Sequence, residues 1–276
     1  MIDGFDVPTF VAATLAEDLG AGGDVTSAAV IPATARLTAV LASRDAVTVA
    51  GLWLAAAFFV ALDPDATVET LVREGASVVP GTPLLRVAGN ARALLAAERS
   101  ALNTVQHLTG IATLTRAYVD AIAGTGAVLL DTRKTLPGLR ALEKYAVRAG
   151  GGTNHRLRLD DGVMIKDNHI AVAGGVDAAV RAAKASGLTG IVVEIDRIDQ
   201  IEPALAAGAD RLLLDNMGAV VLREAVALIA GRAPTEASGG VNLDTIRAIA
   251  ETGVTFISVG RITQSAPAAD IGMDYA

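Results

Sequence analysis

A strand, a polar turn and a helix follow one another repeatedly in the second half of this 276-residue chain. Short apolar segments ending in turn residues predict six strands there, at 127–130, 163–165, 191–193, 211–214, 235–237 and 255–259. Helical patterns fall between them, at 139–149, 176–185, 219–230 and 243–251. The last four strands begin only about 20 residues apart, which suits βα units with parallel strands. The pattern therefore predicts a closed or nearly closed α/β barrel, with a doubly wound open sheet as the alternative.

The first hundred residues have a different rhythm, with short strands predicted at 36–42, 47–50, 68–72 and 84–87. A buried helix is expected over 51–62. A long helix follows, because its apolar residues recur at three, four or seven positions: Leu95, Leu102, Val105, Leu108 and Ala112. The segment 74–85 is similar to the hairpin of biotinyl and lipoyl carrier domains, but Pro80-Gly81 stands where the carrier lysine belongs. A tight turn between sheet strands is the better interpretation.

Composition excludes several classes of protein. There is no cysteine, so disulfides, thiolate metal sites and a cysteine nucleophile are ruled out. A net charge of −7 argues against nucleic-acid binding and against a basic membrane-surface protein. The longest uncharged apolar stretch, 47–62, is short of the ~20 residues that span a bilayer. The N-terminus carries Asp3 and Asp6 and lacks the basic start of a targeting segment, so a cytoplasmic protein is expected.

Polar residues follow each of the six predicted strands. In a βα barrel the chemistry lies where strands end and helices begin, so these residues are expected to meet at one rim. They are the groups Asp131-Thr132-Arg133-Lys134, Lys166-Asp167-Asn168-His169, Glu194-Ile195-Asp196, Asp215-Asn216, Ser238-Gly239-Gly240 and Gly260-Arg261.

The cations of this acidic chain are concentrated in one region. Residues 131–169 hold eight Lys or Arg against five Asp or Glu, and three of the four lysines. This distribution predicts an anionic substrate with several charges. For Arg140, Lys144 and Arg148, a solvated helix face is an equally good interpretation, since they lie four residues apart.

Two further features add to the predicted site. Ser238-Gly239-Gly240 precedes a helix and Gly260 ends the next strand, and such turns can hold a phosphate with backbone N–H groups. Glu194 and Asp215 each follow an apolar strand. Two carboxylates among cations can bind hydroxyls, hold Mg²⁺ beside a phosphate or stabilise a developing positive charge, and they can also form ion pairs with Arg133 or Lys166.

Several long motifs, in order along nearly the whole chain, resemble the quinolinate phosphoribosyltransferase family. The central ones are Asp131-Thr-Arg-Lys-Thr-Leu-Pro-Gly-Leu-Arg, Glu143-Lys-Tyr-Ala-Val-Arg, Gly150-Gly-Gly-Thr-Asn-His-Arg and Ile165-Lys-Asp-Asn-His. Others are Glu17-Asp-Leu-Gly, Glu98-Arg-Ser-Ala-Leu-Asn, Glu236-Ala-Ser-Gly-Gly-Val and Asp270-Ile-Gly-Met-Asp. Arg261 and Gln264 depart from the family pattern, which commonly has a small residue and a histidine there.

The resemblance implies a fold and an activity. The fold is an N-terminal α/β sandwich, residues 1–108 with 266–276, joined to an incomplete, seven-stranded α/β barrel, residues 109–265. The reaction joins quinolinate to 5-phosphoribosyl 1-pyrophosphate with Mg²⁺, and gives nicotinate mononucleotide, pyrophosphate and CO₂ in NAD biosynthesis. The family is at least dimeric, with active sites shared between subunits.

The resemblance also implies roles for individual residues. The residues expected to bind the two carboxylates of quinolinate are Arg133, His155, Arg156, Lys166 and, from a neighbouring subunit, Arg99. Lys134, beside Thr132, is expected to contact the pyrophosphate. Glu194 and Asp215 are expected to contact the ribose and its metal. The 5-phosphate is expected to bind Ser238, Gly239, Gly240 and Gly260. Val259 and Arg261, on either side of Gly260, are also expected to contact substrate. Within this set Lys134, Lys166, Glu194 and Asp215 are the expected catalytic residues.

Three other functions remain open at this stage. One is an aldolase-type lyase in which Lys166 or Lys134 forms a Schiff base at a strand end. Another is a non-catalytic relative of the pyrophosphorylases, similar to those encoded with molybdate transporters. The third is a nicotinate-specific phosphoribosyltransferase, which would need a clamp for only one carboxylate.

Overall fold

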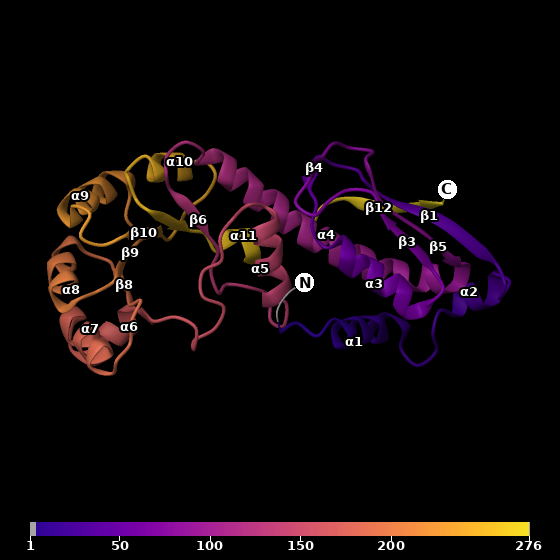
Figure 1. Cartoon of the computed structure of the whole chain (residues 1–276), viewed down its shortest axis with the longest axis horizontal. Helices are drawn as coiled ribbons and strands as arrows, with labels where there is room; N and C mark the ends of the chain where they lie inside the picture. Colours follow the sequence, from indigo (N-terminus) through magenta and orange to yellow (C-terminus); the bar gives the residue numbers. More distant parts are fainter. Residues whose placement is uncertain (1–3, 276) are drawn as a thin grey trace. The chain divides into compact units, whose positions relative to one another are not determined.

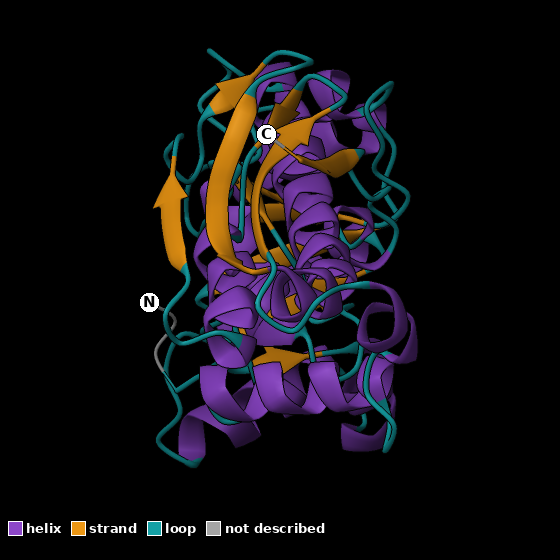
Figure 2. Ribbon diagram, turned by 90° about the vertical axis from the view of Figure 1, so that its right-hand side faces the viewer, coloured by secondary structure: helices purple, strands orange, loops and turns teal. Residues whose placement is uncertain are grey.

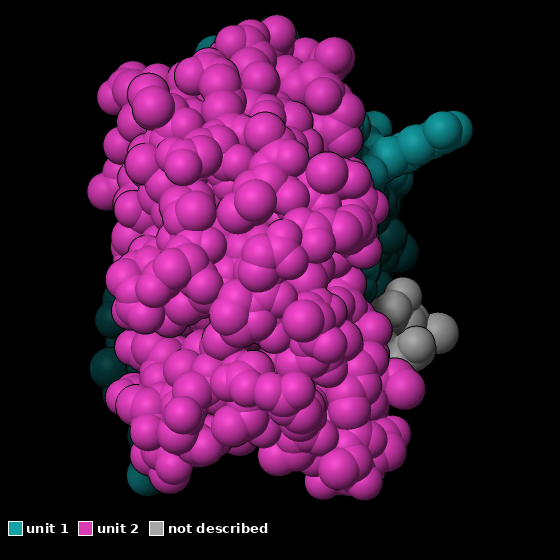
Figure 3. Space-filling model, turned by 90° about the vertical axis from the view of Figure 1, so that its left-hand side faces the viewer, with its two compact units in different colours: residues 1–116, 141–151, 266–276 teal, residues 117–140, 152–265 magenta. Residues whose placement is uncertain are grey.

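The computed structural model describes residues 4–275, and the chain divides into two compact units. Unit 1 comprises the chain up to residue 116, residues 141–151 and the chain from 266 onward; unit 2 comprises residues 117–140 and 152–265 (Figure 3). The domain boundary between residues 108 and 109 that the resemblance implies stays a prediction.

Unit 1 is built on a four-stranded antiparallel sheet in the order β12-β1-β5-β3. Its strands are β12 (Ile271–Tyr275), β1 (Arg36–Ser43), β5 (Pro83–Asn90) and β3 (Thr67–Thr70). Figure 2 shows long strands of this sheet in orange toward the viewer. β2 (Val47–Thr48) and β4 (Ser77–Val78) form a separate pair. The strands expected before residue 90 are therefore confirmed, and Gly81, with φ +81°, makes the tight turn before β5.

The helices of unit 1 are α1 (Val7–Leu19), α2 (Val25–Val30), α3 (Leu52–Leu62), most of α4 (Ala91–Ala121) and most of α5 (Arg140–Ala149). α3 is the expected buried helix, and the Glu74 carboxylate accepts hydrogen bonds from its first backbone N–H groups. α4 is the expected long helix, but Leu95 is only half-buried while Leu94 is fully buried. No described helix is long and apolar enough to cross a membrane.

Unit 2 carries a six-stranded parallel sheet in the order β6-β11-β10-β9-β8-β7. The strands are β6 (Val128–Leu130), β7 (Met164–Ile165), β8 (Val192–Ile195), β9 (Arg211–Asp215), β10 (Thr235–Ser238) and β11 (Phe256–Ser258). All six were expected from the sequence. The resemblance implies seven strands, whereas the described part of unit 2 has six in this sheet and, beside β6, one isolated parallel bridge between Leu130 and Thr153. This bridge and β7 lie at the two edges of the sheet, so the barrel is open.

Helices cover the outer side of this curved sheet (Figure 1). They are α6 (Asp167–Ala173), α7 (Val176–Ala185), α8 (Ile201–Ala207), α9 (Ala219–Ile229), α10 (Ile246–Ala250) and α11 (Arg261–Gln264). α10 begins later than expected, because the Asn242 side chain accepts hydrogen bonds from the N–H groups of Asp244 and Thr245 and forms a turn there. The sequence pattern missed the short helices α6, α8 and α11. The mixed α/β architecture is confirmed, and its parallel strands bring their carboxyl ends to one edge.

Candidate active site

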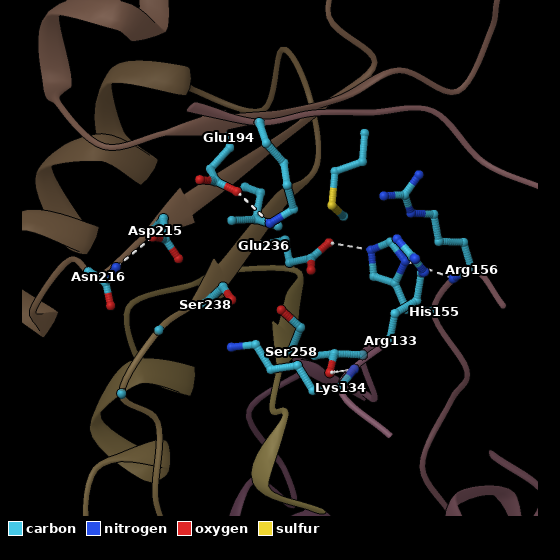
Figure 4. A pocket seen from close by; sticks show the side chains of 16 residues that line it. Arg133, Lys134, His155, Arg156, Glu194, Asp215, Asn216, Glu236, Ser238 and Ser258 are labelled. Atoms are coloured by element: carbon cyan, nitrogen blue, oxygen red, sulfur yellow. Dashed lines mark hydrogen bonds and ion pairs between the residues drawn. The ribbon is translucent and has the colours of Figure 1, made fainter. Parts of the chain in front are cut away.

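A cavity of about 480 Å³ lies at the carboxyl ends of the parallel strands of unit 2 (Figure 4). Its walls come from the turn after β6, the loop at 155–156, and residues in or just after the other five strands. Eleven of the sequence-predicted site residues line it: Thr132, Arg133, Lys134, His155, Arg156, Lys166, Glu194, Asp215, Ser238, Gly239 and Gly240. Residues from strands that are far apart in sequence therefore meet in one place, as the strand-end argument predicts.

Arginine side chains form one end of the cavity. Arg156 donates through Nη1 to the carbonyl oxygen of Gly162 at 2.8 Å. Burial, and then the charge of Arg133, lower the pKa of Arg156 from its usual value. The Nε of Arg133 is buried and has no hydrogen-bond partner among the described residues. An anion placed here would relieve the repulsion between the two guanidinium groups and give Arg133 an acceptor.

A buried aspartate fixes the loop that carries His155 and Arg156. The carboxylate of Asp131, fully buried at the end of β6, accepts from the Asn154 Nδ2 at 2.6 Å and from the His155 N–H at 2.8 Å. Backbone hydrogen bonds also join Thr153 to β6. These hydrogen bonds hold the loop alongside β6, so the first residue of the Asp131-Thr-Arg-Lys motif has a structural role there.

The opposite end of the cavity is acidic. Lys166 Nζ lies 3.0 Å from Glu194 Oε2, and this amine joins β7 to β8. Burial, and then the neighbouring charge of Glu194, raise the pKa of Asp215, against the opposite effect of Lys166 and Lys134. A positive charge placed beside Asp215 and Glu194 would be stabilised by the two neighbouring carboxylates.

The glycine turn after β10 leaves little room for side chains. Gly239 has φ +90°, and a Cβ there would come 2.1 Å from Asn216 Oδ1 and 2.8 Å from the Asn216 backbone nitrogen. Asn216 in turn donates through Nδ2 to Asp215 Oδ2 at 2.5 Å. The turn therefore packs directly against the residue that fixes Asp215, and only glycine fits at position 239.

Four predicted site residues are not among those that line the cavity. Arg99 lies on α4 within unit 1. Val259 is buried, and Gly260 packs against Lys134, whose Cδ would lie 2.7 Å from a Cβ at that position. Arg261 begins α11, and its charge opposes the rise that burial causes in the pKa of Tyr118. Lys144, for which a solvated face was one interpretation, is fully buried, so that interpretation is wrong for it.

Sequence reasoning missed four lining residues: Met164, Leu213, Glu236 and Ser258. A fifth, Asn216, was expected at this rim as a strand-end residue but was given no role in the site. The most informative of them is Glu236, a fully buried carboxylate in the middle of β10. Its only signal was a single charged residue inside an otherwise small and apolar strand.

Comparison with known proteins gives a family for both parts of the chain. The model of the quinolinate phosphoribosyl transferase N-terminal domain matches residues 24–109, and that of the C-terminal domain matches residues 111–274. The chain belongs to the quinolinate phosphoribosyltransferase family. The two domain models cover successive parts of the chain, and the resemblance inferred from the sequence motifs is confirmed.

Several relatives of this phosphoribosyltransferase chain are similar over almost its full length. A nicotinate-nucleotide pyrophosphorylase [carboxylating] of Mycobacterium leprae is 45% identical over 94% of each chain. A chloroplastic protein of the same name from Oryza sativa is 41% identical over 98% of this chain and 77% of its own length. The solved nicotinate-nucleotide pyrophosphorylase from Francisella tularensis superposes with a TM-score of 0.94, at 38% identity, over 100% of this chain and 99% of that one.

Proposed function

We propose that this protein transfers a phosphoribosyl group from 5-phosphoribosyl 1-pyrophosphate to quinolinate, with decarboxylation, in NAD biosynthesis. Nicotinate mononucleotide, pyrophosphate and CO₂ are the products. The observation that carries the proposal is the division of one cavity into an arginine-rich end and a carboxylate end. A dianionic acceptor and a sugar that develops positive charge need these two environments side by side. Membership of the family supports the same reaction.

The arginine-rich end would bind the two carboxylates of quinolinate. Arg133 and Arg156 offer planar N–H groups that suit carboxylates, and Lys166 stands between this end and Glu194. Holding both carboxylates fixes the direction of the ring nitrogen, which must face the anomeric carbon of the ribose. A nicotinate-specific enzyme would need fewer of these cations.

The remaining residues suit the second substrate. The Ser238-Gly239-Gly240 turn would hold the 5-phosphate, and Lys134 would meet the departing pyrophosphate. As the C–O bond to pyrophosphate breaks, the electron pair leaves with it, and the ribose gains oxocarbenium character that Glu194 and Asp215 stabilise. The ring nitrogen then forms the new bond. After CO₂ leaves, its bonding pair stays on ring C2 beside the now positive nitrogen, and C2 takes up a proton.

Mg²⁺ fits the carboxylate end as an ion shared with substrate oxygens. Glu194 and Asp215 would supply hard oxygen ligands. Burial, and then the charge of Glu194, raise the pKa of Asp215, and a cation bound beside it would oppose this shift. The described residues include no group of three or more His, Asp or Glu side chains that could hold a metal by themselves. Bound Mg²⁺ would neutralise pyrophosphate charge, while Glu194 and Asp215 would orient the ribose hydroxyls.

We also propose that the protein works as a homodimer or larger homo-oligomer in the cytoplasm. The support for shared sites is the family pattern for Arg99, which lies in unit 1 and not among the residues that line the unit 2 cavity. The aldolase alternative has less support, since Lys166 forms an ion pair with Glu194 that does not suit a nucleophilic amine.

The test is a reconstituted assay. The pure protein is mixed with quinolinate, 5-phosphoribosyl 1-pyrophosphate and Mg²⁺, and nicotinate mononucleotide and CO₂ are measured. Product should require all three components, and nicotinate should not replace quinolinate. Equal turnover with nicotinate would assign the nicotinate-specific reaction, and no turnover with normal binding of the pyrophosphate substrate would favour the non-catalytic relative.

A further inference from the structure

The wall of the cavity contains a carboxylate that none of the steps above uses. Glu236 lies on β10, its side chain is completely buried, and Figure 4 shows it between the acidic end and His155. A buried negative charge beside a binding site for a dianion works against binding. The groups that contact Glu236 show what stabilises this charge.

Arg211 provides the counter-charge for Glu236. Arg211 Nη1, from the neighbouring strand β9, donates to Glu236 Oε2 at 3.2 Å. The guanidinium of Arg211 also lies over the ring of Phe256 on β11, with 4.1 Å from Cζ to the ring centroid. Three adjacent strands therefore hold the carboxylate in place.

The same carboxylate oxygen faces His155. Nε2 of His155 lies 3.4 Å from Glu236 Oε2, while Nδ1 accepts a hydrogen bond from the Arg156 N–H at 2.7 Å. A ring nitrogen that accepts a hydrogen bond carries no proton, so the neutral ring has its proton on Nε2, toward Glu236. Burial alone would raise the pKa of Glu236, but His155, Ser258 and Arg211 lower it overall, which keeps the carboxylate ionised.

We propose that Glu236 is a positioning residue that fixes the ring of His155 and, through it, the backbone of Arg156 at the quinolinate end of the cavity. This inference rests on the proposed function. The direction of the ring that Glu236 sets also fixes how His155 faces the cavity. Glu236 then acts on the substrate only through His155 and Arg156.

Two substitutions separate the hydrogen bond from the charge. In Glu236→Gln the amide oxygen can still accept from His155 and Arg211, whereas Glu236→Leu keeps a similar volume and accepts from neither. Glu236→Leu should raise the KM for quinolinate about tenfold or more, the effect of losing a hydrogen bond to a charged group, and leave the KM for 5-phosphoribosyl 1-pyrophosphate nearly unchanged. Glu236→Gln should recover most of the affinity for quinolinate. Glu202→Leu is the matched control, since Glu202 also pairs with an arginine, Arg232, but is exposed.

Nitrogen NMR of the imidazole rings gives an independent readout. The chain has only three histidines, and the spectrum of a His155→Gln variant identifies the signals of His155. The unmodified protein should show His155 with a protonated Nε2 and a bare Nδ1, and Glu236→Leu should mix the tautomers.

The opposite tautomer, or an imidazolium at pH 7, would overturn the proposal whether or not the Leu variant folds. An equal rise in both KM values would also overturn it, since that is the effect of general structural damage. If the unmodified protein does not turn over quinolinate, the proposed function fails, and the NMR result still decides whether Glu236 fixes the ring of His155.

Discussion

Replacing Gly239 with alanine should damage both stability and the phosphate end of the cavity, and Gly240→Ala provides the matched control. Both glycines have positive φ, +90° and +62°. An L-residue in such a conformation costs about 1–2 kcal/mol, so both variants share this backbone term. The two variants differ in the room available for the new Cβ. A Cβ at Gly240 meets no heavy atom within 4 Å, whereas one at Gly239 lies 2.8 Å from the Asn216 backbone nitrogen.

The extra cost at Gly239 follows from what cannot move. The Asn216 side chain can rotate away, but this breaks its 2.5 Å hydrogen bond to Asp215. The backbone nitrogen cannot rotate away, since it donates to the carbonyl oxygen of Ser238 at 2.8 Å. Overpacking of this kind costs about 1–3 kcal/mol, so Gly239→Ala should lose about 2–5 kcal/mol of unfolding free energy in total.

Denaturant unfolding and steady-state kinetics check this prediction together. Gly239→Ala should show the larger fall in the unfolding midpoint and a rise in the KM for 5-phosphoribosyl 1-pyrophosphate that exceeds any rise for quinolinate. Gly240→Ala, in the same phosphate turn, should show the smaller loss of stability and the smaller rise in that KM. Equal effects of the two substitutions on stability and on both KM values would refute the reasoning, because the contact with Asn216 would then play no part.

Further predictions concern the charged residues. Asp215→Asn should abolish turnover yet raise the unfolding midpoint of the ligand-free protein. Because the pKa of Asp215 is raised in the folded protein, its ionised carboxylate destabilises the fold. The gain in stability should therefore shrink toward zero as the pH falls below the ordinary pKa of 3.8. Arg133→Ala should lower kcat/KM for quinolinate at least about 30-fold while circular dichroism stays unchanged, and a variant that keeps most of its turnover would remove Arg133 from the site. If sites are shared between subunits, mixing inactive Arg99→Ala with inactive Lys166→Ala should restore roughly a quarter of the activity through mixed dimers, and a mixture that stays inactive would contradict shared sites.

The sheet of unit 2 was predictable because a buried parallel strand has a simple local signal. Its residues are apolar, it is short, and a polar turn follows it. The short helices were harder to predict. α6 begins at Asp167, directly after β7, and the ring of His169 accepts the Lys166 N–H through Nδ1. That contact depends on side-chain geometry, which no periodicity in the sequence records.

The candidate site was predictable where charge breaks an apolar pattern at the end of a strand, as at Glu194 and Asp215. Glu236 was missed because it stands inside its strand, at a position where a carboxylate is tolerated only when its partners are present. Those partners, Arg211 and His155, are distant in sequence. The interactions of a buried charge are long-range properties of the fold, so local reasoning finds the residue only after the fold is known.

The arrangement of charge in the cavity explains why an acidic chain concentrates its cations in one segment. A cavity with only positive charge would bind both substrates but would oppose the positive charge that forms on the ribose. A cavity lined mainly by carboxylates would stabilise that charge and repel quinolinate. Lys166 Nζ lies 3.0 Å from Glu194 Oε2, at the place where the positive end and the negative end of the cavity meet. This ion pair keeps the charges of the two ends apart. Replacing Lys166 with methionine should therefore weaken binding of quinolinate and also raise the pKa of Asp215, since Lys166 opposes that shift. A shift to higher pH of the acidic limb in the plot of kcat against pH would show the raised pKa of Asp215. An unchanged acidic limb would mean that the two ends of the cavity act independently.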